Sequence, residues 1–347
     1  MKIAIITDTH FGARNDSSSF DEFFKTFYTD VFFPYLEKTG IKTVFHLGDV
    51  FDRRKYINFN TLRSCKKYFF DPLQAHGVDM YVIPGNHDTY YKNTNDVNSI
   101  DLLLREYDNI NVIERPSVMT FDDRSFTFVP WLCADNYAES MQAIQQPGDI
   151  CVGHFEVAGF DMFRGVKNDG GMDRKLLQQY SMVLTGHFHH RSTDDNIYYL
   201  GSPYGFTWSD YGDDRGFHVL DTKTRDLQFI QNPNNIFHKI YYDDRKPLAD
   251  PSQFRKACVK VIITNKNDYA KFDKFVDALY INEVYELTIH EDFSDFESDA
   301  LENENVNIED TMTLLSEYVD SVQSAKDKDR LKTLLKTLYV EAQHLSE

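Results

Sequence analysis

Five short segments of the chain end in residue types that bind metal ions or move protons. Each follows a stretch of apolar, β-branched character and carries aspartate, asparagine or histidine at or just beyond its end. The segments are, in chain order, Asp8–His10 (DTH), Gly48–Asp52 (GDVFD), Gly85–Asp88 (GNHD), Gly153–His154 (GH) and Gly186–His189 (GHFH). Carboxylate, imidazole and amide groups bind borderline divalent metals, and imidazole also exchanges protons near neutral pH.

The stretches that lead into these residues are predicted to be β-strands, because they are short, rich in Val and Ile, and stopped by Gly, Asn or Asp. Helical patterns separate them, such as the Phe-rich run that an SFDE capping box opens at Ser19. The expected strands are Lys2–Asp8, Lys42–Asp49, Asp79–Asn86, Asp149–His154 and Met182–His187. This alternation predicts an α/β layer structure, in which functional groups collect beyond the carboxyl ends of the strands.

No single segment identifies a site, since a DxH pair, a GDxxD turn and a histidine at a strand end are all common. A packing role is expected for seven other histidines: His46, His76, His190, His218, His238, His290 and His344. The joint occurrence of five such strand ends, in order, predicts a metal site. Asp8 with His10, and His187 with His189, are also i, i+2 pairs, whose members leave an extended chain on the same side.

Seven residues are the expected metal ligands: Asp8, His10, Asp49, Asn86, His154, His187 and His189. They are too many for one ion and suit two, provided that a carboxylate bridges them. Asp49 is the expected bridge because its strand should lie between the others. One ion would take Asp8, His10, Asp49 and His189, and the other would take Asp49, Asn86, His154 and His187. A ligand set without thiolate suits Mn²⁺, Fe²⁺ or Zn²⁺ better than Ca²⁺.

The charge of such a centre predicts its substrate. Two anionic ligands leave two divalent ions with about two positive charges, which favours a phosphate group. A hydroxide held between the ions would attack phosphorus in line with the leaving oxygen. His87 should leave its strand on the other side and is expected to protonate that oxygen, while Asp52 would hold the imidazole and favour its protonated form.

The chain of 347 residues is expected to contain more than one structural unit. Residues 1–240 carry the motifs and should form the main domain, and residues 254–290 read as a small βαβ domain. An acidic linker is expected over residues 291–307. Two amphipathic helices follow over residues 308–345, and they would either fold back on the main domain or bind a partner protein.

The formal net charge of −18 argues at first against nucleic acid as a partner. However, half of it lies in one stretch, Glu291–Asp310, which holds nine acidic residues and no Lys or Arg. The basic run Arg53, Arg54 and Lys55 therefore stays a candidate DNA contact beside its reading as a solvated patch. No apolar run is long enough for a membrane helix, and the four cysteines lack a CxxC pair, so a reduced cytoplasmic protein is expected.

The five motifs between Asp8 and His189 resemble those of the calcineurin-like metallophosphoesterase superfamily. Within it, GDVFDRRK, PGNHD, GHFH and YLGSPY resemble SbcD-type DNA-repair nuclease subunits, including those of the recombination complexes of T4-like phages. The resemblance implies a sandwich of two mostly mixed β-sheets flanked by helices, with a small βαβ capping domain that helps to position DNA. Position 52 departs from relatives that have His there, so the pairing of Asp52 with His87 replaces the role expected from the family.

The same resemblance implies partners and cofactors. It implies two divalent ions, most often Mn²⁺ with Mg²⁺ as the alternative, and exonuclease and endonuclease activity in double-strand-break repair and recombination-dependent replication. It also implies a homodimer formed by helices of the catalytic domain, and an SbcC-like, ABC-type coiled-coil ATPase held by residues 308–345. If a phage encodes the chain, its location would be the host cytoplasm.

Three other functions are weighed against the nuclease. A protein Ser/Thr phosphatase usually shows GDxVDRG and GNHE, whereas this chain has GDVFDRR and GNHD. A cyclic-nucleotide or other small phosphodiesterase would not need a linker followed by a helical pair. A DNA-tethering scaffold without activity tends to lose ligands, and none is missing here.

Overall fold

The computed structural model describes residues 1–146, 148–163, 166–291 and 328. The chain divides into two compact units, Met1–Glu291 and Asp292–Glu347, and the helices and strands given below belong to the first. Apart from Glu291 and Lys328, the predicted acidic linker and helical pair lie outside the described residues.

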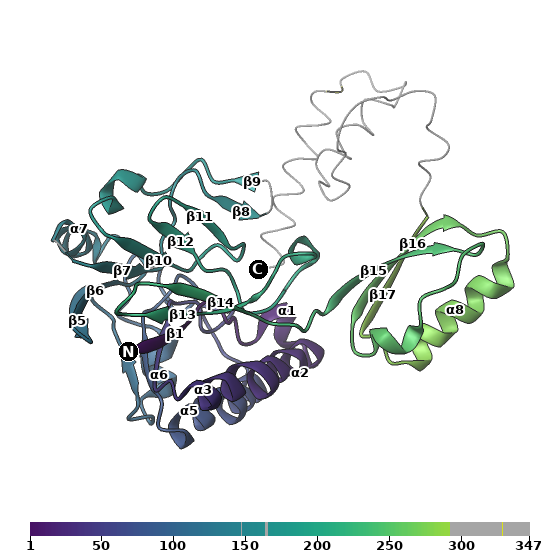
Figure 1. Ribbon diagram of the computed structural model, residues 1–347, viewed down its shortest axis with the longest axis horizontal. Helices are drawn as coiled ribbons and strands as arrows, with labels where there is room; N and C mark the ends of the chain where they lie inside the picture. Colours follow the sequence, from purple (N-terminus) through teal and green to yellow (C-terminus); the bar gives the residue numbers. More distant parts are fainter. Residues whose placement is uncertain (147, 164–165, 292–327, 329–347) are drawn as a thin grey trace. The chain divides into compact units, whose positions relative to one another are not determined.

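Two six-stranded sheets form the centre of the first unit (Figure 1). The first sheet has the order β14 (Leu227–Gln231), β13 (Gly216–Asp221), β1 (Lys2–Ile6), β2 (Thr43–His46), β3 (Asp79–Val82) and β4 (Ile110–Val112). The second has the order β11 (Ser192–Asp194), β12 (Ile197–Tyr199), β10 (Met182–Thr185), β7 (Ile150–Gly153), β6 (Arg124–Val129) and β5 (Ser117–Phe121). Neighbours are parallel from β1 to β4 and from β12 to β6, and antiparallel at the remaining pairs. The predicted α/β fold with two mixed sheets is confirmed.

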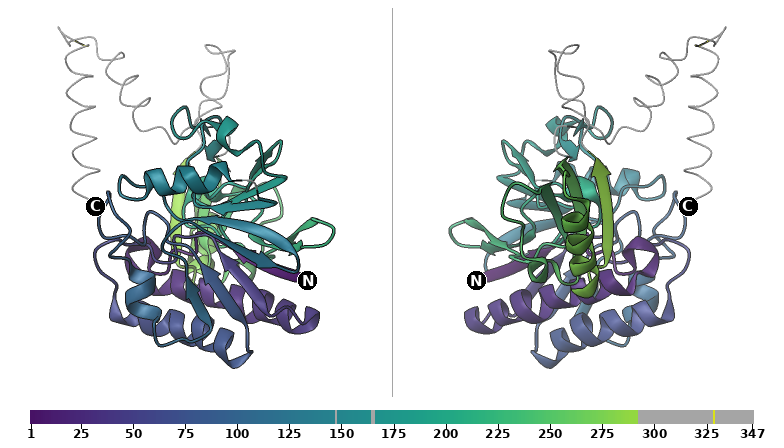
Figure 2. Two further views of the ribbon diagram at one scale, coloured as in Figure 1. Left: turned by 90° about the vertical axis from the view of Figure 1, so that its left-hand side faces the viewer. Right: turned by 90° about the vertical axis from the view of Figure 1, so that its right-hand side faces the viewer.

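Helices cover both outer faces of the pair of sheets (Figure 2). Their bounds are α1 (Ala13–Asp16), α2 (Ser18–Phe27), α3 (Phe33–Thr39), α4 (Phe59–Cys65), α5 (Asp71–Ala75), α6 (Ser99–Leu104) and α7 (Tyr137–Gln145). A π-helical turn joins α2 to α3, and another joins α4 to α5. Helices α2 to α6 pack on the first sheet, and α7 packs on the outer face of the second.

Strand β1 shows why its sequence is almost continuously apolar. Ala4 and Ile6 face the helices, whereas Ile3 and Ile5 face the second sheet, because successive side chains of a strand point to opposite faces. Because both faces of this strand are buried, neither face exposes a position that favours polar residues. The same packing holds the carboxyl end of β1, where Asp8 and His10 follow, in a fixed position.

The predicted capping box at Ser19 is wrong. Helix α2 starts at Ser18, with Ser17 before it and no side-chain cap. The Glu22 carboxylate, which should have closed the box, instead accepts a hydrogen bond from Tyr285 Oη at 2.9 Å and pairs with Lys256. Contacts far apart in the sequence thus outweigh the local motif.

A third sheet is built from the end of the first unit. Its parallel strands are β15 (Phe237–Asp243), β16 (Cys258–Asn265) and β17 (Glu286–Glu291), and α8 (Tyr269–Ile281) connects the last two. The predicted strand, helix and strand are therefore present, and β15 joins them from the region assigned to the main domain. The division into a nuclease domain and a capping domain stays a prediction.

Three further features complete the first unit. Strands β8 (Asp161–Phe163) and β9 (Val166–Lys167) form a short antiparallel pair. All four cysteines are buried free thiols. Among the described residues, no helix combines the length and the apolar character that crossing a membrane requires.

Candidate metal centre

The five motifs meet at one place, although they come from two sheets and not from one. Strands β1, β2 and β3 of the first sheet deliver the first three motifs, and β7 and β10 of the second deliver the last two. Several predicted ligands turn out of their strands in left-handed backbone conformations, which are rare for residues other than glycine. Their φ angles are 52° at Asp8, 42° at His10, 54° at Asp49 and 89° at His187. Such strain gathers where the surrounding structure holds functional groups in place.

Two glycines allow the motifs to approach so closely. A Cβ atom at Gly85 would lie 2.2 Å from Oδ1 of Asp49, and one at Gly48 would lie 2.7 Å from Nδ1 of His154. Gly48 also has a φ of 95°. The glycines of GDVFD and GNHD are therefore required by the contact between the two motifs.

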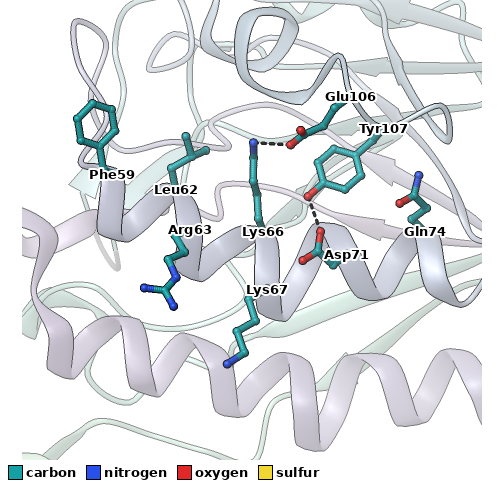
Figure 3. A pocket seen from close by; sticks show the side chains of 9 residues that line it. All are labelled: Phe59, Leu62, Arg63, Lys66, Lys67, Asp71, Gln74, Glu106 and Tyr107. Atoms are coloured by element: carbon teal, nitrogen blue, oxygen red, sulfur yellow. Dashed lines mark hydrogen bonds and ion pairs between the residues drawn. The ribbon is translucent and has the colours of Figure 1, made fainter.

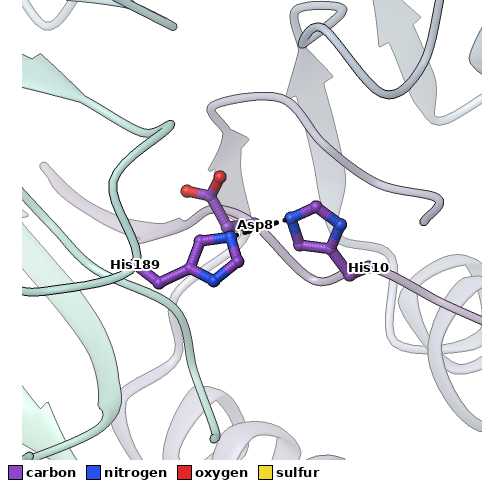
Figure 4. Close-up of side chains that lie close together, drawn as sticks. All are labelled: Asp8, His10 and His189. Atoms are coloured by element: carbon purple, nitrogen blue, oxygen red, sulfur yellow. Dashed lines mark hydrogen bonds between the residues drawn. The ribbon is translucent and has the colours of Figure 1, made fainter. Parts of the chain in front are cut away.

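Asp8, His10 and His189 form one side of the centre. Their potential ligand atoms all lie within 4.8 Å of one another, and the Nε2 atoms of the two imidazoles are 3.0 Å apart (Figure 4). The ring of Phe206 closes this side, with its centroid 5.2 Å from that of His10. The side chains thus converge on one point inside an apolar wall.

Asn86, His154 and His187 form the other side. The Oδ1 atom of Asn86 lies 3.0 Å from Nε2 of His154 and 3.0 Å from Nδ1 of His187. The other ring nitrogen of His154, Nδ1, donates to the carbonyl of Leu47 at 2.7 Å. This bond sets the tautomer, so the lone pair of Nε2 faces the centre, as in a metal-ligating histidine.

Asp49 lies between the two sides. Its Oδ2 atom is 3.6 Å from Nε2 of His10 and 3.4 Å from Nε2 of His154. Its Oδ1 atom accepts the backbone N–H of His87 at 2.7 Å. The structure therefore brings all seven predicted ligands together with Asp49 in the middle, while their division between two ions stays a prediction.

The electrostatics of the centre favour positive charge beside Asp49. Burial alone would lower the pKa of His10, but its contact with Asp52 and the charge of Asp49 outweigh burial and raise the pKa to about 9. The pKa of His154 is raised to about 9 by Asp49, again against burial. Burial also opposes ionisation of Asp49, yet His154 holds the pKa of that carboxyl well below its usual range.

Divalent ions fit this donor set. Carboxylate, imidazole and amide groups converge without thiolate, which suits Mn²⁺, Fe²⁺ or Zn²⁺. Because Nδ1 of His154 donates to the Leu47 carbonyl, Nε2 is the nitrogen that would bind a metal ion in place of its proton. The carboxylates of the centre favour protons on His10 and His154. A divalent metal ion would supply more positive charge at the same place.

His87 and Asp52 are in contact, through an atom that the sequence did not suggest. Nδ1 of His87 bonds the backbone carbonyl of Asp52, whereas the Asp52 carboxylate lies 3.4 Å from Nδ1 of His10. Because a carbonyl only accepts, Nδ1 of His87 carries a proton and Nε2 is the atom left for a substrate. The rings of His87 and His10 are 4.9 Å apart, so His87 stands beside the centre.

Asp88 fastens two of the motifs together. Its buried carboxylate accepts N–H groups from Val50 at 3.0 Å, Phe51 at 3.1 Å and Gly85 at 2.9 Å. Burial, and then the charge of Asp49, raise its pKa to about 7. Asp88 thus links GNHD to the neighbouring motif, since it holds the backbone that follows Asp49.

Sequence reasoning missed two other residues at the centre. The buried guanidinium of Arg215 bonds the carbonyl of His189 and also pairs with Asp210 at 2.8 Å. The indole of Trp131 lies against His187, with ring centroids 5.2 Å apart. Neither residue lies within the five motifs, and both lie far along the chain from the ligands that they touch.

The three predicted DNA-contacting residues differ in their surroundings. Arg53 is engaged within the protein, since it bonds Asp16 at 2.9 Å and the hydroxyl of Tyr56 at 2.7 Å. Arg54 donates from Nε to the carbonyl of Asn86 at 2.6 Å, and Lys55 is exposed. Arg54 is therefore the one of the three with a bond to a residue of the centre.

A cavity of about 710 Å³ lies elsewhere, over α4 and α5 (Figure 3). Its lining residues are Phe59, Leu62, Arg63, Lys66, Lys67, Asp71, Gln74, Glu106 and Tyr107. None of them is among the predicted site residues. Lys66 pairs with Glu106 at 2.5 Å, and Tyr107 donates to Asp71 at 2.6 Å.

Comparison with known proteins defines the class. The chain belongs to the calcineurin-like phosphoesterases, whose family model matches residues 1–191, so the superfamily predicted from the motifs is confirmed. It is 32% identical over 350 residues to exonuclease subunit 1 of Enterobacteria phage T4, and the match covers 99% of each chain. Membership of the family, with the clusters around Asp49, implies divalent metal ions as cofactors.

Solved structures match less closely. An archaeal phosphodiesterase is 14% identical, with a TM-score of 0.35 over 67% of this chain and 100% of its own. A hypothetical protein from Thermus thermophilus is 15% identical, with a TM-score of 0.38 over the same shares. These scores are too low to carry an argument about function.

Proposed function

We propose that the chain is a DNA phosphodiesterase with two divalent metal ions, most often Mn²⁺ with Mg²⁺ as the alternative, and that it acts as both exonuclease and endonuclease. The observation that carries the proposal is the convergence of seven potential ligands, with Asp49 in the middle of the other six. Support comes from the 32% identity to exonuclease subunit 1, which extends along 99% of the chain. The groupings of Asp8 with His10 and His189, and of Asp49 with His154 and His187, support the ligand division expected from the sequence.

The metal ions would supply the charge that binds the phosphodiester and activates water. The chain supplies the rest. Asp49 and Asp8 offset the positive charge, and the bond from His154 Nδ1 to Leu47 keeps that imidazole oriented. In its imidazolium form, His87 would give the proton on Nε2 to the leaving oxygen and keep the Nδ1 proton on the Asp52 carbonyl.

Arg54 is proposed to hold the substrate. Its Nε–H bond to the Asn86 carbonyl places the guanidinium beside the centre, and a guanidinium binds phosphate through paired N–H groups. Lys55 would add charge to the same surface, whereas Arg53 would mainly support the loop through Asp16. The Asp52 carboxylate would act through His10, which it contacts at 3.4 Å.

The proposed setting is a complex. The name of the T4 relative contains the word subunit, which supports a partner for this chain as well. We assign that role to an ABC-type coiled-coil ATPase bound by residues 308–345, in a homodimeric assembly that processes DNA breaks and recombination intermediates in the cytoplasm. The small sheet with α8 would help to position DNA.

Incubation with Mn²⁺ and end-labelled single- and double-stranded DNA, with and without the ATPase, tests the proposal. The wild-type chain should release nucleotides, and Asp49→Asn should not. If the wild-type chain left DNA intact while it hydrolysed phosphoproteins or cyclic nucleotides, the nuclease assignment would be wrong and a phosphatase or small phosphodiesterase would replace it.

A further inference from the structure

Trp131 lies at the border between the metal centre and solvent. Its ring centroid is 5.9 Å from that of His154, at an interplanar angle of 72°, and 5.2 Å from that of His187, at 40°. His154 is fully buried, whereas Trp131 is only half-buried. The indole therefore touches the centre and also presents part of its surface to a ligand.

Two exposed tyrosines follow the GNHD motif, separated from it by Thr89. Tyr90 and Tyr91 are 41% and 51% exposed, and their ring centroids are 4.7 Å apart. They stand on a loop whose ends are joined by a bridge between Thr89 and Asn98, and by the bond from Tyr90 N–H to the Val97 carbonyl at 2.9 Å. Large aromatic side chains are thus exposed on a loop that begins at the centre.

Hydrogen bonds fasten this loop to the segment that carries Trp131. The amide of Asn95 donates to the Trp131 carbonyl at 2.9 Å, and the N–H of Asp135 donates to the Asn93 carbonyl at 3.0 Å. Trp131 N–H also donates to the Pro84 carbonyl, just before GNHD, at 2.9 Å. The three aromatic residues therefore stand on two segments whose backbones are joined by hydrogen bonds.

We propose that Trp131, with the Tyr90–Tyr91 pair beyond it, is a stacking site for nucleobases that have left the double helix. The inference rests on the proposed nuclease function and adds a substrate class to it. A nucleotide whose phosphate binds at the centre carries its base one sugar away from that phosphate. The Trp131 ring lies against His187, so it is close enough to the centre to meet this base. Indole and phenol rings stack on any base without reading its sequence.

This site selects DNA by strand structure. A base inside a duplex has both faces covered by its neighbours, so it reaches Trp131 only after it unpairs and unstacks. Single strands and frayed or mispaired ends meet that requirement before they bind. The chain is therefore expected to cleave a mispaired end faster than a fully paired end of the same length.

The test compares Trp131→Leu, which keeps an apolar wall against His187, with Trp131→Phe, which keeps an aromatic face. The substrate is a single-stranded oligonucleotide with Mn²⁺ and the full chain, with its ATPase present if cleavage requires it. The nucleotide beside the scissile phosphate is either natural or abasic. Wild type should lose roughly tenfold in kcat/KM on the abasic strand, because stacking of one base is lost.

Trp131→Leu should lose the same factor on the natural strand and nothing more on the abasic one, and Trp131→Phe should recover most of the loss. If Trp131→Leu slowed cleavage of both substrates equally, the indole would have only a packing role against His187, and the proposal would be overturned. Absence of Mn²⁺-dependent cleavage by the wild-type chain on any DNA would instead reject the nuclease function itself.

A binding measurement separates stacking from activity. An oligonucleotide with 2-aminopurine at the same position should lose fluorescence when it binds His87→Ala protein, because stacking quenches the probe, and should keep it with His87→Ala/Trp131→Leu. Tyr90→Ala/Tyr91→Ala should weaken binding of long strands, whereas Tyr280→Ala, which removes another exposed tyrosine, should not. Unquenched probe in both His87 proteins, or unchanged binding by the double tyrosine variant, would contradict the proposal.

Discussion

The metal centre and the cavity over α4 and α5 both contain charged side chains, yet they differ in where those side chains point. At the centre, side chains from five strand ends converge on Asp49, with contacts of 3.4–3.6 Å to the imidazoles on either side. Among the residues that line the cavity, Lys66 is neutralised by Glu106, while the side chains of Arg63 and Lys67 point away from that pair (Figure 3). Convergence of potential metal ligands favours the centre, and not the cavity, as the reactive site.

The two regions also differ in how much structure maintains them. The centre keeps charged groups buried and its backbone strained at four predicted ligands, and it is held by the three N–H bonds of Asp88 and by the guanidinium of Arg215. The cavity is formed by side chains along helices and involves no such support. Strain and burial of charge persist only where surrounding bonds enforce them, so substitutions at the centre should have far larger effects.

The largest effect is expected for Asp49→Asn. Loss of the central carboxylate removes the charge between the two sides of the centre, so Mn²⁺ affinity should fall and nuclease activity should drop by about 10⁴-fold, as for a member of a catalytic unit. Activity on labelled DNA and Mn²⁺ binding by calorimetry measure the two effects. Normal Mn²⁺ binding by this variant would show that Asp49 is not a metal ligand.

The next effect is expected for His87→Ala. A general acid contributes typically 10²–10⁴-fold, so kcat should fall by about that factor while Mn²⁺ binding stays unchanged, because His87 stands beside the ligands. His76→Ala, at the residue that follows α5, is the matched control and should behave as wild type. Loss of bound metal in His87→Ala would show that His87 is a ligand and would reject its role as proton donor.

A smaller effect is expected for Asp88→Asn, which leaves the shape of the side chain unchanged. An amide nitrogen would face backbone N–H groups that now meet a carboxylate oxygen, so about 1–3 kcal/mol of stability should be lost. Mn²⁺ affinity should fall by roughly 10–100-fold, as for residues that orient metal ligands. Thermal unfolding and Mn²⁺ titration test this, and unchanged metal affinity would mean that the two motifs hold each other without Asp88.

The sequence predicted the centre better than its surroundings, and the reason is physical. Asp8, Asp49 and Asn86 follow strands whose apolar character is local, so both the strand and its end can be read from a few neighbouring residues. That β7 and β10 belong to a second sheet is set by packing between sheets, which no local pattern encodes. The resemblance to a known family supplied that part of the fold.

Contacts with partners distant in the sequence were the least predictable. The Asp52 carboxylate faces His10 rather than His87, because the backbone turns after Asp8 and Asp49 decide where each side chain points. In the same way, the Glu22 carboxylate contacts Lys256 and Tyr285 and does not form the predicted capping box. Trp131 has no motif, and only the three-dimensional structure places its ring against His187.

The smallest effect is expected in the cavity, for Lys66→Ala and Lys67→Ala. The Lys66–Glu106 pair lies at the surface, where such pairs contribute about 0–1 kcal/mol, and neither lysine touches a residue of the centre. Hydrolysis of a small phosphodiester by either variant should stay within about twofold of wild type, since a change of 1.4 kcal/mol would already be tenfold. A tenfold loss in kcat/KM would mean that the cavity supports the reaction, and convergence of donors would no longer separate the two regions.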